Sequence, residues 1–315
     1  MQFRYKQLIN WSKMTGGNVM KRTFAALLAL LLTLAGCGSQ PAADGRTVLR
    51  LDADGSAVLS DAMRLFNAAS ADYRVVMDTE APDIVAGGAG YESSNLVDIM
   101  PHVDSGMSRE DILPFLLDGL EEDGALYALP VRWGGMSYGC SKELLDGRLT
   151  LSEAEALELL DGLGEGALLF PGWANDVPWQ LNAYQPEYDR ETELEAYYSL
   201  PSLLERVNIS SVEQLAAMVT DGALWDTGCP GFEPETDCLT LSILASCGDV
   251  EGAWEFLSFV YGPDSRPAIE LGDGCLLPAG AEQLYARLAE QEGVDEAALE
   301  LARAYVDGMS LRGAA

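Results

Sequence analysis

The chain has 315 residues, of which 48% are hydrophobic, and a formal net charge of −31 from 50 acidic and 19 basic side chains. This hydrophobic content indicates a folded protein with a substantial core, and the negative charge argues against nucleic acid and anionic lipid surfaces as partners. His102 is the only histidine, which excludes Cys/His zinc sites and His-dependent catalytic triads.

Residues 1–36 have the pattern of a secretory leader. The basic Met20-Lys21-Arg22 precedes an apolar run that is too short to span a bilayer, and Leu34-Ala35-Gly36-Cys37 follows it. That motif resembles the bacterial lipobox, which implies cleavage before Cys37 and a diacylglyceryl group on its thiol. A plain signal peptide or a single membrane helix is the alternative.

Two consequences follow for the mature protein. We expect it to begin at Cys37, with an acyl chain such as palmitate, and to be held at the outer, extracellular face of the cytoplasmic membrane. Met20 is the expected true start, because the signal is already complete without residues 1–19. The leader holds five basic side chains and no acid, so its removal makes the net charge about −36.

The body opens with the pattern of a parallel α/β sheet. After a small, polar tether at 37–46, Thr47–Asp52 is predicted as a strand, and apolar residues at helical spacing follow over 58–69. Tyr73–Asp78 and Asp83–Ala86 are predicted as two further strands. Strands that alternate with a helix favour parallel pairing with right-handed crossovers.

In the middle of the chain the sequence pattern predicts secondary structure for some segments only. Asp111–Leu120 is predicted as an amphipathic helix, and Glu121–Gly124 as a turn into an apolar run. Pro130 in that run indicates an edge strand or the end of a strand. Two overlapping capping boxes over 150–155 predict a helix start, whereas 170–198 shows no clear period.

Regular patterns return in the last third of the chain. Ser211–Val219 is predicted as a helix, Leu239–Ala245 as a strand and Gly252–Tyr261 as another helix. The segment Ala281–Leu311 is predicted as two helices that separate near Gly293.

Several of these segments resemble one family. Asp111–Leu120, followed by Asp123-Gly124-Ala125-Leu126-Tyr127-Ala128-Leu129-Pro130-Val131, looks like the helix and "DGxLYALP" stretch of the sugar-binding type of extracellular solute-binding proteins of ABC importers. Val250–Phe259 is similar to that family's "EAAWEFLKF" helix. Pro82-Asp83-Ile84-Val85 and Gly274-Cys275-Leu276-Leu277-Pro278 agree with it more weakly and in the family's order.

The resemblance implies an α/β, two-lobed, periplasmic-binding-protein-like (Venus flytrap) fold with strands that cross a hinge. Lobe one is expected at 47–131 and 238–275, and lobe two at 132–237 and 276–315. Both lobes are expected to be shortened, because only about four residues separate Asp78 from Asp83, where the family places a helix, and because the middle of lobe two is also short. A smaller or more open cleft is the consequence.

Sugar binding requires flat aromatic faces and polar groups, and these select the candidate residues. Tyr91 follows a Gly-rich turn that lacks the lysine and spacing of a phosphate loop. Arg132 is a candidate for holding a ligand carboxylate, or for pairing with a nearby Glu. The candidate ligand-binding residues are Trp133, Trp173, Trp179, Tyr184, Asp54 and Tyr91. The alternatives are packing in the core for the tryptophans and turn formation for Asp54.

The sequence points to binding rather than catalysis. It contains no nucleophile elbow and no metal-ligand cluster, and we expect no enzymatic activity and no cofactor. The five cysteines after Cys37 include no C-x-x-C pair, so disulfides and free thiols both stay open. They are Cys140, Cys229, Cys238, Cys247 and Cys275.

The predicted function is a lipid-anchored, monomeric protein that captures a small polar solute, above all a sugar or oligosaccharide, for an ABC importer. Its expected partners are the solute, the permease subunits, and the membrane through the lipid on Cys37. The alternative is a surface lipoprotein that keeps the binding-protein fold but serves as a sensor or adhesin.

Overall fold

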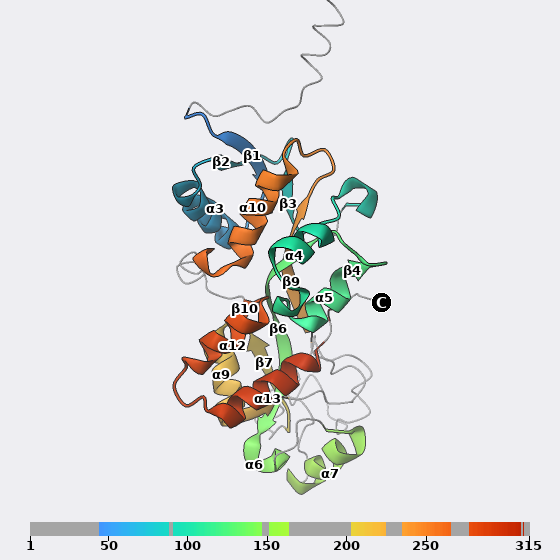
Figure 1. Cartoon of the computed structure of the whole chain (residues 1–315). Coiled ribbons are helices and arrows are strands. Elements are labelled where there is room, and N and C mark those ends of the chain that lie inside the picture. The colour runs from blue at the N-terminus through green and yellow to red at the C-terminus, as the bar shows by residue number, and fades with distance from the viewer. Residues whose placement is uncertain are drawn as a thin grey trace, which may run out of the picture.

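The computed structural model describes residues 44–87, 91–146, 151–163, 203–224, 235–265, 277–309 and 311. Two α/β bodies lie end to end, and long strands run from one into the other (Figure 1). One eight-stranded sheet passes through both, with the order β10-β6-β9-β3-β1-β2, while β7 and β8 pair with β6. The predicted two-lobed α/β fold is therefore confirmed.

The upper body in Figure 1 begins with three parallel strands. β1 (Thr47–Asp52) pairs with β2 (Tyr73–Met77) on one side and with β3 (Ile84–Ala86) on the other. Helix α3 (Ala57–Ala69) forms the crossover, and it buries Leu59, Ala62 and Phe66 beneath the sheet. These elements match the sequence prediction, including the short β2–β3 connection, in which no helix lies between Met77 and Ile84.

Helix α10 (Val250–Tyr261) packs beside α3. The ring of Phe66 makes edge-on contacts with Phe256 and Phe259, at centroid distances of 5.2 and 5.4 Å. The family motif that this helix resembles has alanine where the chain has Gly252. A Cβ built at Gly252 would lie 2.2 Å from Cε1 of the Tyr73 ring, so an alanine here would force the ring to move.

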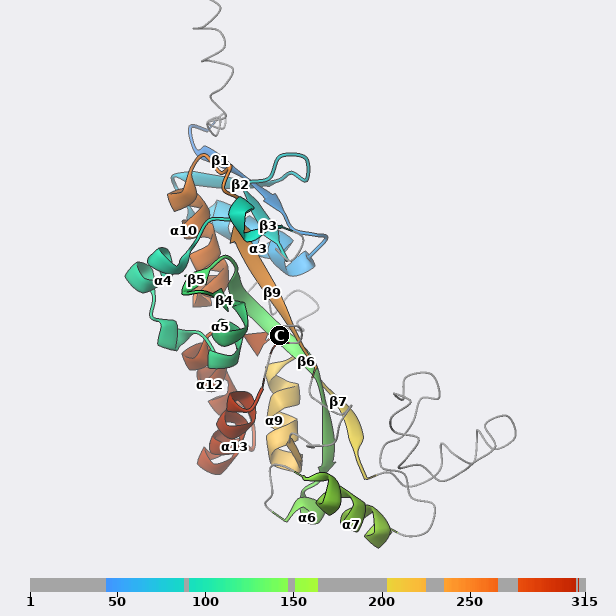
Figure 2. The same cartoon turned by 90° about the vertical axis from the view of Figure 1, so that its right-hand side faces the viewer.

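Short elements cover another side of the upper body (Figure 2). They are η2 (Ser93–Asn95), α4 (Met100–Gly106), η3 (Arg109–Asp111), α5 (Pro114–Leu120), and the hairpin of β4 (Glu121–Glu122) and β5 (Ala125–Leu126). The predicted helix at 111–120 is divided, since Leu113 donates its N–H to Ala279 O at 2.9 Å and α5 begins only at Pro114. Asp123 and Gly124 make the hairpin turn with φ values of 52° and 86°.

Two long antiparallel strands connect the bodies. β6 (Leu129–Ser141) pairs with β9 (Glu235–Ile243) over its first half, and with β7 (Glu205–Ile209) and β8 (Gly222–Leu224) over its second. The expectation that Pro130 marks an edge or a strand end is wrong, because β6 begins one residue before it and continues. The register shifts between Pro130 and Arg132, and this irregularity accommodates a residue that lacks an N–H.

The lower body consists of β7, β8 and helices around the second half of β6 (Figure 2). Ser152 caps α7 as predicted, because its Oγ accepts the N–H of Glu155 at 3.4 Å and its own N–H is donated to Glu155 Oε2 at 2.8 Å. Gly293, with φ +83°, separates α12 from α13 at the predicted place. The helices are α6 (Lys142–Leu145), α7 (Glu153–Leu163), α9 (Val212–Asp221), α12 (Ala281–Ala289) and α13 (Glu296–Asp307), and β10 (Leu277–Pro278) borders β6.

The outer edge of β2 is closed by a side chain. The amide of Asn67 donates to Val75 O at 2.8 Å and accepts the Val75 N–H at 2.7 Å. Both main-chain groups of that edge residue are thereby satisfied within the chain.

The buried side chains of both bodies form one continuous cluster, from Leu49 and Phe66 to Leu288 and Val306. No helix among the described residues is long and apolar enough to cross a membrane. The lobe boundaries at 131/132 and 237/238 stay predictions, and the leader and Cys37 lie outside the described residues.

Candidate functional site

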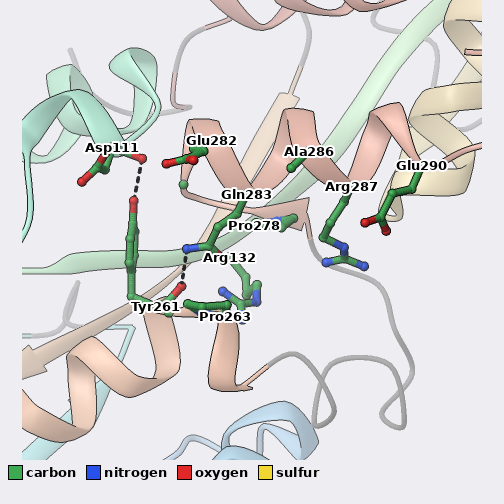
Figure 3. A pocket seen from close by; sticks show the side chains of 12 residues that line it. Asp111, Arg132, Tyr261, Pro263, Pro278, Glu282, Gln283, Ala286, Arg287 and Glu290 are labelled. Atoms are coloured by element: carbon green, nitrogen blue, oxygen red, sulfur yellow. Dashed lines mark hydrogen bonds between the residues drawn. The ribbon is translucent and has the colours of Figure 1, made fainter. Parts of the chain in front are cut away.

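A cavity of about 420 Å³ lies where the two bodies meet (Figure 3). The upper body contributes η3, the end of α10 and the start of η5 (Pro263–Ser265), and the lower body contributes β10 and α12. β6 passes between them. The lining residues are Asp111, Arg132, Tyr261, Gly262, Pro263, Pro278, Gly280, Glu282, Gln283, Ala286, Arg287 and Glu290.

Arg132 on β6 is the deepest charged group of this wall, with 1% of its surface exposed. Its Nη2 donates to Ser265 Oγ at 2.8 Å, and Nη1 donates to the carbonyl of Val131. Its Nε–H has no hydrogen-bond partner. Among the described residues no carboxylate lies within 4.0 Å of the guanidinium, so the expected pairing with a nearby Glu is not seen there.

The surroundings of Arg132 disfavour its charge. Burial lowers its pKa to about 10, and the positive charge of Arg287 contributes to the same change. The group nevertheless remains protonated at neutral pH. A buried guanidinium with an unused N–H is therefore held beside a cavity.

Tyr261 joins the two bodies at one end of the cavity. Its hydroxyl donates to Asp111 O at 2.6 Å, and its carbonyl accepts Nε2 of Gln283 at 3.1 Å (Figure 3). Burial raises the pKa of the Tyr261 phenol, which therefore stays a neutral donor. Hydrogen bonds thus connect α10 to η3 and to α12 at this end of the cavity.

The rim of the cavity is polar. Glu282 on α12 and Glu290 at the C-cap of this helix are exposed, and Arg287 on the same helix is half-buried. Asp111 directs its carboxylate away, since Oδ2 accepts the N–H of Ser108 in the cap of η3. The site therefore combines a buried cationic wall with acceptor oxygens at its entrance.

A second group of polar residues lies at the carboxyl end of β1. Asp54 is exposed with φ 46°, and its N–H is donated to Asp52 Oδ1 at 3.1 Å. Ser56 caps α3 by accepting the Leu59 N–H. Asp54 thus stands at the sheet edge where open α/β folds bind ligands, and it also forms the turn that the alternative predicts.

The structure places the other predicted residues as follows. Trp133 is fully buried, donates Nε1–H to Pro278 O at 3.0 Å and packs edge-on against Phe115. In this conformation it is a core residue with no face open to a solute. Tyr91 is 41% exposed, next to three residues outside the described ranges. Trp173, Trp179 and Tyr184 lie outside the described residues.

Two of the described thiols are weakly acidic. Burial raises the pKa of Cys238 to about 12 and that of Cys247 to about 11. Cys140, Cys238 and Cys247 form no disulfide. No group of three or more His, Cys, Asp or Glu side chains that could hold a metal ion occurs in the part of the chain that the structure describes.

Sequence reasoning did not find Tyr261, Gln283 or Arg287. Tyr261 and Gln283 sit in amphipathic helices whose patterns predict core and surface positions, not a shared cavity. They come together because β10 brings the start of α12 against β6, a long-range pairing that no local pattern encodes. Arg132 could be found, since a charged residue inside an apolar strand pattern is unusual.

Comparisons with known proteins place the fold. No protein-family model and no curated protein matches the sequence. The solved structure of the sugar-binding protein MalE from Xanthomonas citri is similar, with 11% identity over 84% of this chain and 86% of that one and a TM-score of 0.56.

Two further solved structures are similar at a TM-score of 0.54 and 14% identity. An extracellular solute-binding protein of family 1 from Alicyclobacillus acidocaldarius matches over 87% of this chain and 88% of its own. Thiaminase I from Bacillus thiaminolyticus matches over 84% and 93%. The chain has the fold that these proteins share, which is the two-lobed fold of the extracellular solute-binding proteins.

Proposed function

We propose that the protein captures a small polar solute, of the sugar class, between its two lobes and presents it to an ABC importer. The observation that carries this proposal is the cavity at the lobe junction, with walls from both bodies on either side of β6. A solute that contacts both walls stabilises the conformation in which they are close. The two solute-binding proteins of the same fold support this reading.

The proposal is tested by ligand screening of the full chain in mild detergent. A panel of neutral and acidic monosaccharides, oligosaccharides and polyols is scored by the change in melting temperature, which a ligand of the native state must raise. Small-angle scattering of each hit then measures closure as a decrease in the radius of gyration. A flat response over the whole panel, or binding without any compaction, would count against a transport receptor and favour the sensor or adhesin alternative.

Catalysis is the second candidate, because thiaminase I shares the fold. The raised pKa values of Cys238 and Cys247 argue against these two thiols as nucleophiles, since little thiolate exists at neutral pH. We therefore propose binding without chemistry. Mass spectrometry of each bound solute after prolonged incubation is expected to return its mass unchanged, and a new mass would identify an enzyme.

Lipid attachment is proposed from the sequence motif. We infer that Cys37 is acylated after cleavage of the leader, which keeps the receptor next to its permease in the membrane. Cells that express Cys37→Ala are expected to lose the protein from the membrane fraction. Retention of the variant in that fraction would refute lipid anchoring through Cys37.

A further inference from the structure

We propose that the cavity at the lobe junction binds the carboxylate of a small hydroxylated acid, such as a sugar acid, and that Arg132 is the residue that holds this carboxylate. The inference rests on the proposed function and narrows its solute from polar compounds in general to monoanionic ones.

The state of Arg132 supports an anionic ligand. Its guanidinium is buried, and the described residues provide no carboxylate within 4.0 Å to balance its charge. Burial of an unbalanced cation is unfavourable unless an anion or several hydrogen bonds compensate it. Its two occupied donors go to neutral oxygens of Val131 and Ser265, and its buried Nε–H is unused in this conformation.

A second guanidinium lines the same cavity. Arg287 of α12 is close enough for its charge to contribute to the lowered pKa of Arg132. Two like charges that line one cavity repel each other, and an anion near them offsets that repulsion. The planar fork of an arginine matches the geometry of a carboxylate.

The remaining lining selects among anions. The exposed carboxylates of Glu282 and Glu290 on the rim disfavour a dianion such as phosphate, and their oxygens can accept hydrogen bonds from hydroxyl groups. The volume of about 420 Å³ suits a ligand of monosaccharide to disaccharide size. A monocarboxylate with several hydroxyls can place its carboxylate against the arginine side chains and donate hydrogen bonds from its hydroxyls to the carboxylates of the rim.

The walls also belong to different bodies. Arg132 is anchored to η5 of the upper body through Ser265, whereas Arg287 belongs to α12 of the lower body. An acid that is held by Arg132 and also contacts α12 therefore favours the arrangement in which the two bodies are close.

The test compares matched pairs of ligands on the full chain in mild detergent by isothermal titration calorimetry. Glucuronate is measured against glucose, and galacturonate against galactose, at equal ionic strength. The variants are Arg132→Met, which removes the charge with little change of volume, and Glu282→Gln on the exposed rim. The control is Arg64→Gln on α3, an exposed arginine whose ion pair with Asp61 is remote from the cavity.

We expect the acids to bind at least tenfold more tightly than their neutral partners. Arg132→Met should abolish this preference, Glu282→Gln should strengthen acid binding about two- to fivefold, and Arg64→Gln should change nothing. Because Glu282→Gln alters only an exposed side chain, it remains informative if Arg132→Met does not fold.

Three outcomes overturn the inference. Neutral sugars that bind while the acids do not would keep the proposed function and remove the acidic solute. Acid binding that Arg132→Met leaves intact would place the carboxylate elsewhere. The third outcome is a folded protein that binds none of these four compounds but does bind another solute of the screening panel. The proposed function would then hold, and the carboxylate site at Arg132 would be refuted.

Discussion

The contact between Gly252 and Tyr73 makes a sharp stability prediction. Gly252→Ala should stabilise α10 by about 1 kcal/mol if helix propensity alone decided the outcome. The new Cβ would, however, lie 2.2 Å from Cε1, 2.7 Å from Cδ1 and 2.8 Å from Cζ of the Tyr73 ring. Overpacking of this kind costs about 1–3 kcal/mol, so after the gain in helix propensity we expect a net destabilisation of up to about 2 kcal/mol.

A double-mutant cycle separates the two effects. In a Tyr73→Ala background the ring is gone, and Gly252→Ala should then stabilise the protein by up to about 1 kcal/mol. Urea unfolding of the four proteins measures each free energy of unfolding. Stabilisation by Gly252→Ala in the wild-type background, or equal effects in both backgrounds, would refute the steric explanation.

Three further predictions concern single contacts. Asn67→Ala removes both hydrogen bonds to Val75 and should lower the free energy of unfolding by about 2 kcal/mol, measured by urea titration. Asp104→Asn tests the ion pair with Arg109, which lowers the pKa of Asp104. The stabilisation by this pair exists above the pKa of the unfolded carboxyl and is lost as pH falls through the lowered folded pKa, so the melting temperatures of wild type and variant should converge in acid. Cys238, with its pKa raised to about 12, should react with iodoacetamide far more slowly in the native than in the unfolded protein, and equal rates by peptide mapping would contradict its burial.

Local patterns predicted most of the elements because local chemistry decides them. Ser152 and Glu155 form the cap that their spacing predicts, and Gly293 takes the positive φ that ends a helix pair. The two-lobed α/β fold followed from the family resemblance and is confirmed. The order of the strands, in which β3 lies between β1 and β9, was not predicted.

Tertiary contacts decided the remainder. Pro130 lies at the start of β6, which pairs with both β9 and β10. The shift in register between Pro130 and Arg132 accommodates the N–H that proline lacks. Trp133 and Arg132 are neighbours in one strand, yet Trp133 packs on α5 and Arg132 reaches η5. No sequence rule gives these directions, since they depend on which helices cover each face of the sheet.

The closed edge of β2 has a consequence for how copies of this protein behave when they are crowded together. An open strand edge invites the edge of another molecule, and the resulting ribbon can grow without limit. The side chain of Asn67 is hydrogen-bonded to both the N–H and the C=O of Val75, so this edge does not offer another strand a continuous row of donors and acceptors. At high local concentration, copies of the protein can therefore remain separate molecules that do not pair through this edge.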